Sequence, residues 1–374
     1  MKLESLHLKN FRTYEDLTVS FDKRLTFITG RNASGKTNLL EAVSLLSLGK
    51  SFRGSSDQDM IARNSDHYHI ASRYLRGEST YKLEMGCSLA GNALKRRIKL
   101  NDKQLGGRSA LIGNLITVIF SPADIAIVEG GPAERRRFLD IALSSHDPEY
   151  LRVLMQYNRA LKQRNAVLKR IKKNDSTPAD LAPWDLNLSS LAEILIRTRS
   201  RFVSDFQDIF RSSLERISGS QDDITLGLSL SAEGEADDFR SVLERYQRRD
   251  TIMGFTTIGP HRHNLSFETE GRDIMSFGSQ GQKRSLVLAL RVAQFYYLTD
   301  RLKLSPILLI DDVIRELDSA RRGAFVELLH ECGQAIFTTP DMDGLERLIG
   351  DLGEQIGLYT ITEPGALEVA SPAI

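Results

Sequence analysis

The chain has 374 residues, of which 41% are hydrophobic and 26% charged, so it can build two lobes with large cores and does not have the composition of a disordered protein. Lys and Arg number 50 against 49 for Asp and Glu, so the overall charge does not attract polyanions and any nucleic-acid affinity must come from local patches. The two cysteines, Cys87 and Cys332, have no Cys or His partner at metal-ligand spacing, which argues against a structural zinc and favours a reducing compartment.

The amino-terminal residues Met1 to Glu4 carry charges that leave no room for the apolar core of a signal peptide. No stretch of the chain approaches about 18 consecutive apolar residues. We therefore expect a cytoplasmic protein without a membrane partner.

A β-rich run, residues 25–29, leads directly into a glycine-rich loop, and apolar positions on one helical face follow it. The loop matches G-x-x-x-x-G-K-[ST] with Gly30, Arg31, Asn32, Ala33, Ser34, Gly35, Lys36 and Thr37. In this motif backbone N–H groups surround phosphates, the lysine reaches the β- and γ-phosphates and the hydroxyl binds Mg²⁺. The alternative is a chance glycine-rich turn, which the position between a strand and a helix disfavours. The loop predicts binding of ATP and Mg²⁺.

The middle of the chain changes from strands to helices. Residues 66–119 have the pattern of short strands, including a basic hairpin at 95–100 that turns at Asn101-Asp102. From about Ala133 the spacing becomes helical, with one run over 151–171 and another over 191–217, joined by a Pro- and Ser-containing segment at 174–183. These runs predict a short helical hairpin, after which strand patterns return near Leu226 and at 265–267.

Two further patterns in the last third favour phosphate chemistry. Residues 277–282, Phe-Gly-Ser-Gln-Gly-Gln, open a helix, and a serine with free amides at a helix N-terminus can bind an anion. The same residues also fit an ordinary N-capped helix. Residues 306–310 predict a buried strand that ends in Asp311 and Asp312, where a P-loop protein needs a carboxylate for Mg²⁺. Taken alone, this second pattern is more often a simple strand end.

The order of these motifs resembles the ATPase heads of the ABC/SMC/Rad50 class. Within that class the chain is similar to the RecF family over nearly its whole length, in the segments Asn10-Phe11-Arg12, Gly130-Gly131-Pro132, 134–140 and Gly259-Pro260-His261-Arg262. The resemblance implies an α/β fold: an ABC/SMC-type P-loop head, with mixed sheets and flanking helices, and an inserted short helical-hairpin arm. We expect a Walker A lobe at 1–120, the arm at 121–254, and a lobe with the signature and Walker B motifs at 255–374.

The resemblance also assigns roles to residues. Nucleotide contacts fall on Arg12, on residues 30–38 ending at Asn38, on Ser279 and on Gln282. Ser279 would bind the γ-phosphate held by a second copy of the chain, and Asp312 would orient the attacking water. The implied catalytic residues are Lys36, Asp311, Asp312 and Ser279, and the implied Mg²⁺ ligands are Thr37 and Asp311. Residues 316–318 match the D-loop that communicates across such dimers.

The sequence departs from the family pattern at several places that concern hydrolysis. Ala33 stands at a common glycine position, His263-Asn264 replace acids, Arg315 replaces a small residue, and the strand at 335–339 ends in threonine where many ABC ATPases have a switch histidine. These departures bear on the rate of hydrolysis more than on nucleotide binding. The resemblance implies a slow, DNA-dependent ATPase that acts as a switch.

Residues 150–173 carry eight cations and no acid, namely Arg152, Arg159, Lys162, Arg164, Lys169, Arg170, Lys172 and Lys173. A basic run is usually a solvated face. Together with the family resemblance, however, it predicts contacts to the DNA backbone through Arg159, Lys162, Lys169 and Arg170. The hairpin residues Lys95, Arg96, Arg97 and Lys99 are a second candidate, and Arg135 to Arg137 a third. No groove-reading motif is present, so binding to backbone and shape is expected.

RecF-like function implies a homodimer that forms with ATP on duplex DNA near single-strand gaps and helps load a recombinase during replication and repair. The implied partners are RecO- and RecR-type mediators and RecA. An SMC- or Rad50-like tether is disfavoured by the short hairpin. A transporter ATPase subunit is disfavoured because residues 118–124 lack the glutamine of a coupling loop, and a related nuclease would need a further carboxylate cluster.

Overall fold

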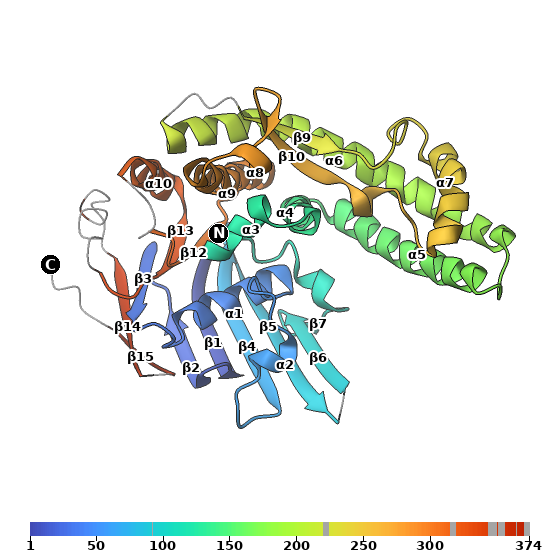
Figure 1. Ribbon diagram of the computed structural model, residues 1–374. Coiled ribbons are helices and arrows are strands. Elements are labelled where there is room, and N and C mark those ends of the chain that lie inside the picture. Colours follow the sequence, from blue (N-terminus) through green and yellow to red (C-terminus); the bar gives the residue numbers. More distant parts are fainter. Residues whose placement is uncertain are drawn as a thin grey trace. The chain divides into compact units, whose positions relative to one another are not determined.

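The computed structural model describes residues 1–91, 93–219, 224–314, 319–342, 350, 356–363 and 365–369 (Figure 1). The chain forms two compact units. The first comprises Met1–Asp124, Ser213–Ser220 and Val287–Ile374, and the second comprises Ile125–Ser212 and Gln221–Leu286. None of the helices within the described ranges is both long and apolar enough to cross a membrane.

An antiparallel sheet in the order β2-β1-β4-β5-β6-β7 forms one layer of the first unit. Its strands are β1 (Lys2–Phe11), β2 (Tyr14–Ser20), β4 (His67–Arg76), β5 (Ser79–Ala90), β6 (Ala93–Leu100) and β7 (Lys103–Gln104). Asn101 and Asp102 have φ of 47° and 63° at the turn between β6 and β7, as a tight hairpin turn with two left-handed residues requires. The predicted basic hairpin is confirmed.

A second, mostly parallel sheet in the order β15-β14-β3-β13-β12-β8 forms the other layer of this unit. Its strands are β3 (Leu25–Gly30), β8 (Thr117–Phe120), β12 (Ile307–Asp311), β13 (Gln334–Thr338), β14 (Gly357–Glu363) and β15 (Ala366–Val369). Strands β3, β13, β12 and β8 are parallel neighbours. Their carboxyl ends therefore meet at one edge, where ligands bind in open α/β sheets.

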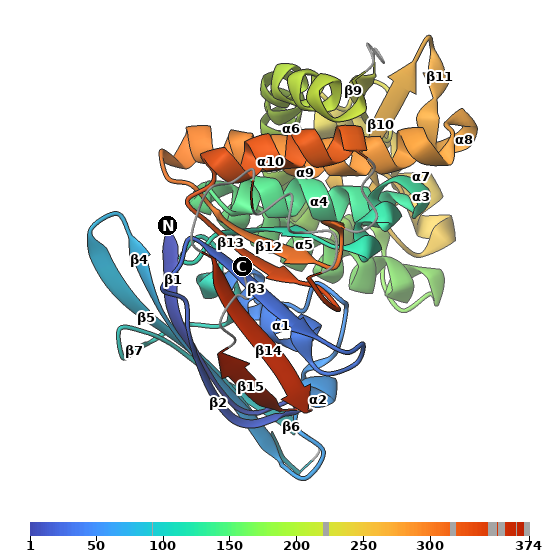
Figure 2. The ribbon, with the colours of Figure 1, turned by 90° about the vertical axis from the view of Figure 1, so that its left-hand side faces the viewer.

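Helix α1 (Lys36–Leu48) lies between the two sheets (Figure 2). Its residues Leu39, Leu40, Val43 and Leu46 join a buried cluster with side chains from both sheets. The helix ends at Gly49, which has φ of 67° and donates to Leu45 O at 2.9 Å, the left-handed cap that glycine favours. Packing on both sides thus holds the loop before α1 at the strand edge. Two further helices of this unit are α2 (Asp57–Met60) and α10 (Ser319–Glu331).

The second unit is mainly helical. Its helices are α3 (Ala126–Glu129), α4 (Pro132–Ser144), α5 (Pro148–Lys172), α7 (Phe239–Met253), α8 (Ile274–Phe277) and most of α6 (Ala182–Ser218), and a sheet has the order β11-β10-β9, with β9 (Thr225–Ser229), β10 (Asn264–Thr269) and β11 (Arg272–Asp273). Helix α9 (Gln280–Leu302) begins here and continues into the first unit. Asp147 caps α5 by accepting from the backbone N–H groups of Glu149 and Tyr150.

Helices α5 and α6 run side by side as the predicted helical hairpin (Figure 1). The expected fold class is confirmed. The first segment of the first unit ends at Asp124, close to the expected boundary at 120. Residues 255–286, however, group with the helical unit, because β10 pairs with β9 and α8 follows directly from β11. The three-part division 1–120, 121–254 and 255–374 stays a prediction about functional lobes.

Candidate nucleotide site

The predicted P-loop joins β3 to α1 at the carboxyl edge of the parallel sheet. Gly30 and Gly35 have φ of 142° and 115°, and a Cβ would come within 2.7 Å of Ile361 O at Gly30 and of Thr13 Oγ1 at Gly35. Glycine is therefore required at both positions. Ala33 also adopts a left-handed conformation, with φ of 65°, which explains why a glycine would be favourable there.

The side chain of Lys36 folds back over its own loop. Its Nζ donates to Gly30 O at 2.5 Å and to Arg31 O at 3.0 Å, and the residue is 6% exposed. Burial lowers the pKa of Lys36, while the nearby carboxylates of Asp312, Asp311 and Asp341 oppose that shift. The lysine thus lies among acids at the strand edge.

Asp311, the last residue of β12, accepts two hydroxyl hydrogen bonds on the same oxygen. Thr37 Oγ1 donates to Asp311 Oδ1 at 2.8 Å, and Thr338 Oγ1 donates to it at 2.7 Å. Asp312 follows with a left-handed φ of 53°, and its N–H donates to Thr338 O at 3.1 Å. Hydroxyl and carboxylate oxygens are the hard donors that Mg²⁺ prefers, so Thr37 and Asp311 fit the predicted metal site. Lys36, Thr37, Asp311 and Asp312 therefore meet at one edge, as expected from their order in the sequence.

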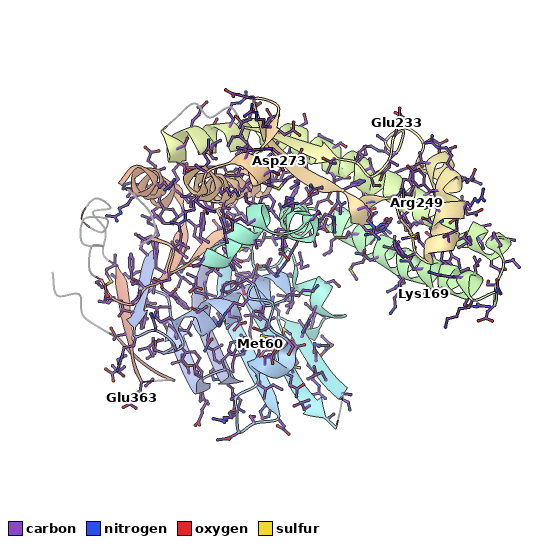
Figure 3. All side chains as sticks on the ribbon, viewed as in Figure 1. Met60, Lys169, Glu233, Arg249, Asp273 and Glu363 are labelled. Carbon is purple, nitrogen blue, oxygen red and sulfur yellow. The ribbon has the colours of Figure 1, made fainter. Side chains whose placement is uncertain are left out.

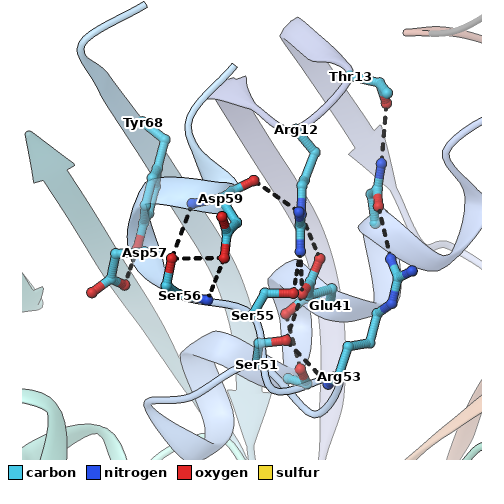
Figure 4. A network of polar contacts seen from close by, with 12 residues as sticks. Arg12, Thr13, Glu41, Ser51, Arg53, Ser55, Ser56, Asp57, Asp59 and Tyr68 are labelled. Carbon is cyan, nitrogen blue, oxygen red and sulfur yellow. Dashed lines mark hydrogen bonds and ion pairs between the residues drawn. The ribbon is translucent and has the colours of Figure 1, made fainter. Parts of the chain in front are cut away.

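Arg12 is held in a network that ties three segments to α1 (Figure 4). Its Nε and Nη2 donate to both oxygens of Glu41 at 2.9 and 2.8 Å, Nη2 also donates to Ser55 Oγ at 2.5 Å, and Nη1 donates to Asp59 O at 2.8 Å. Glu41 is fully buried and accepts a further bond from Ser51, and these donors hold the pKa of its carboxyl below the usual value against the effect of burial. The predicted contact of Arg12 with nucleotide stays a prediction; in this structure its guanidinium binds protein groups.

Asn38 links the P-loop to the segment that follows α1. Its side-chain amide donates to Thr13 Oγ1 at 3.2 Å, and Arg53 Nη1 lies 3.5 Å from Asn38 Oδ1. Glu41 and Thr338 are participants that the sequence patterns did not indicate. Glu41 lies one helical turn after Thr37 on the same face of α1, a spacing that could have indicated it.

The predicted signature residues form a reciprocal cap at the start of α9. Ser279 Oγ accepts from the N–H of Gln282 at 3.2 Å, and the side chain of Gln282 accepts from the N–H of Ser279 at 3.0 Å. The alternative of an N-capped helix is thus present in the structure, and Ser279 is exposed. Exposure also leaves it open to a second copy of the chain, so its role in binding γ-phosphate stays a prediction.

The predicted DNA-binding residues fall into exposed and internally bonded groups. Lys95 and Arg97 on β6, and Arg159, Lys162 and Lys169 on α5, are exposed and form no hydrogen bond or ion pair with any residue that the structure describes. Lys169 lies on the outer side of α5 (Figure 3). Arg96 faces the other way and donates to the buried Asp57, and Arg170 is 3.4 Å from Asp175 O. These five exposed cations have no such partner and are therefore available to a polyanion.

Arg164, one of the eight cations of the basic run, is fully buried. It donates to Asp185 and Asp250, each at 2.6 Å, and to Thr256 at 2.8 Å. It stabilises the contact of α5 with α6 and α7 and is not part of a DNA surface. Residues 316–318, predicted as the D-loop, and Arg315 lie outside the described residues.

Comparison with known proteins identifies the family. The family described as RecF/RecN/SMC N terminal domain matches residues 2–353. A DNA replication and repair protein RecF from Leptospira interrogans is 41% identical over 363 residues, covering 97% of this chain and 98% of the relative, and one from Agathobacter rectalis is 37% identical over 92% of this chain and 93% of the relative. The chain belongs to the RecF family.

Solved structures agree with this RecF assignment. The recombination mediator protein RecF with ATP, in the RecFOR pathway, superposes with a TM-score of 0.88 at 28% identity and covers 99% of this chain and 98% of that chain. The head domain of an SMC protein from Pyrococcus furiosus superposes with a TM-score of 0.55 at 18% identity over 99% of this chain and 96% of that one, which shows a common fold alone. The predicted ABC/SMC-type head is confirmed.

Proposed function

We propose that this RecF-family chain is an ATP-dependent DNA-binding protein of recombinational repair. The observation that carries the proposal is the convergence of Lys36, Thr37 and Asp311 at one strand edge, with Thr37 and Asp311 joined by a 2.8 Å hydrogen bond. Relatives named as DNA replication and repair proteins, and a RecF structure described with ATP, support it.

In this proposal, residues 30–38 bind the triphosphate of ATP through their backbone N–H groups and Lys36, with the N-terminus of α1 adding its dipole. Lys36 Nζ would exchange its bonds to Gly30 O and Arg31 O for phosphate oxygens. Thr37 and Asp311 would hold Mg²⁺, which neutralises charge on the phosphates when bound. Asp312 would orient the attacking water from its fixed left-handed backbone position.

ATP would act as a switch between open and closed states. Two ATP-loaded chains would close, with Ser279 of each contacting the γ-phosphate held by the other, and the dimer would hold duplex DNA near a single-strand gap. Slow hydrolysis would release it. The exposed cations Arg159, Lys162 and Lys169 on α5 supply backbone contacts in this proposal. We further propose that the protein acts with mediators of the RecO and RecR type, helps load RecA and is located in the cytoplasm.

The test is duplex-DNA binding by the wild-type protein and by Lys36→Met, measured with and without ATP. Wild type should bind more tightly with ATP, and Lys36→Met should lose that gain because the methionine cannot contact the β- and γ-phosphates. Arg31→Met is the matched control, since Arg31 lies in the same loop and is exposed. If Lys36→Met still binds duplex DNA more tightly with ATP than without it, the proposal that ATP acts as a switch is wrong.

A further inference from the structure

The outer face of the antiparallel sheet of the first unit carries a trough that runs along β5. A cavity of about 470 Å³ lies there, lined among others by His67, His69, Gly86, Lys95 and Arg97. Cross-strand register places these residues on one face, because Ser88 of β5 pairs with His67 and Lys95, and Gly86 pairs with His69 and Arg97. The opposite face packs Tyr68, Met85 and Ile98 into the buried cluster that also contains the apolar residues of α1.

The floor of the trough is low toward the carboxyl end of β5, because the strand carries small residues there. Gly86 has no side chain and Ser88 a short one, while β4 and β6 on either side carry long side chains. Two interstrand spacings of about 4.8 Å set the walls roughly 10 Å apart. A Cβ added at Gly86 would meet its nearest atoms at 3.6 and 3.7 Å, which is ordinary contact, so nothing in the fold requires a glycine here.

One wall of the trough is a row of available cations. Lys95, Arg97 and Lys99 alternate along β6, which places neighbouring charges about 7 Å apart. In the part of the chain that the structure describes, none of the three forms a hydrogen bond or an ion pair. The one carboxylate in the lining, Glu84, is paired with Lys82 at 3.1 Å and with His69 at 3.6 Å. The wall is therefore unneutralised.

The opposite wall carries the imidazole rings of His67 and His69 on β4. Histidine rings, like other aromatic side chains, stack on unpaired bases, and single strands are recognised by a cationic track combined with such rings. The gap of about 10 Å is narrower than the major groove of B-DNA alone, at about 12 Å, so a duplex does not fit between the walls.

We propose that this trough binds single-stranded nucleic acid, with its phosphates along Lys95, Arg97 and Lys99 and its bases toward His67 and His69. The proposal rests on the proposed function and extends it: α5 contacts duplex DNA, and the β5 trough holds the unpaired strand at a gap. It excludes Arg96, which faces the core and binds Asp57.

The experiment measures binding of a fluorescent oligo-dT of about 15 nucleotides to wild type, Gly86→Gln and Gly86→Glu over a range of salt concentrations. Filling the floor with Gln should weaken binding several-fold, and Glu, which adds a negative charge in the same volume, should weaken it by about tenfold more. With three phosphate contacts at about 0.7 each, the salt slope of the wild type should exceed that of Gly86→Glu by about 2.

The matched control is Thr18→Glu, which adds the same charge on β2, opposite His7 and outside the cavity. It should bind oligo-dT like wild type, and all variants should bind ATP normally. Equal oligo-dT affinity in wild type and Gly86→Glu, or displacement of oligo-dT by poly-glutamate at equal charge, would overturn the trough as a nucleic-acid site. If wild type binds duplex DNA with ATP but not oligo-dT, only the trough fails. If it binds neither, the proposed function fails.

Discussion

Asp311 is the predicted Mg²⁺ ligand, and its Oδ1 accepts hydrogen bonds from both Thr37 and Thr338. Asp311→Asn keeps an acceptor in that place but removes the charge. We expect ATP affinity in Mg²⁺ to fall at least tenfold, while ATP affinity in EDTA stays equal or rises because one negative charge near Lys36 is gone. Isothermal titration in both buffers measures this. An equal loss in both buffers would mean that Asp311 only supports the fold.

Arg12 offers a test that separates a nucleotide contact from a structural ion pair. Its guanidinium binds Glu41, which is fully buried, so Arg12→Leu would leave a buried carboxylate with fewer donors and should cost about 3 kcal/mol of unfolding free energy. The double variant Arg12→Leu/Glu41→Leu should recover much of that loss. Denaturant unfolding and ATP titration are measured together. Weaker ATP binding with unchanged stability would support the contact with nucleotide instead.

At the residue scale, the sequence is informative where the chemistry is local. Eight contiguous residues specify the P-loop, and Asp311 is recognisable because a buried strand precedes it. The pairing of Arg12 with Glu41 joins residues 29 positions apart. It depends on the path of the chain in three dimensions, which no local sequence pattern predicts. Arg164 belongs to the basic run but stands on the apolar face of α5, between Tyr157 and Leu168, and that position is the sequence signal of its burial.

At the element scale, α5 presents three exposed cations that form no hydrogen bond or ion pair with any described residue. Arg159, Lys162 and Lys169 are exposed on α5, and alanine at all three should reduce the salt slope of duplex binding by about 0.9 for each phosphate that is no longer neutralised. Arg152→Ala is the control, because Arg152 lies on the same helix but pairs with Glu149. Filter binding at several salt concentrations gives the slopes. An unchanged slope in the triple variant would remove α5 from the DNA surface.

The elements themselves were largely predictable. The helical hairpin and the basic β-hairpin follow from periodicity and from the Asn101-Asp102 turn, which adopts the left-handed conformations that these residues tolerate. Periodicity does not predict which strands pair with one another. Residues 265–267 were expected to be a strand, but their pairing with β9, which draws 255–286 into the helical unit, depends on long-range packing.

At the scale of the whole molecule, the phosphate-binding loop and the predicted signature belong to different compact units. Residues 30–38 and Asp311 lie in the first unit, and Ser279 lies in the second, capping α9. A site assembled from two copies would therefore use the first unit of one and the second unit of the other. A substitution can therefore test dimerisation separately from nucleotide binding, since a change at Ser279 leaves the chain's own P-loop intact.

Ser279→Arg should abolish dimerisation with a non-hydrolysable ATP analogue while the affinity of each chain for that analogue stays within about twofold. The arginine places a long cation where the partner's lysine-bearing loop would approach, and like charges repel. Ser279→Thr keeps the hydroxyl and the capping bond to the Gln282 N–H, so it should dimerise like wild type. Sedimentation velocity with the analogue, with ADP and without nucleotide measures assembly, and titration measures affinity. Two results would contradict a nucleotide site shared between two copies. One is that Ser279→Arg still forms dimers with the analogue, and the other is that the single Ser279→Arg chain no longer binds the analogue.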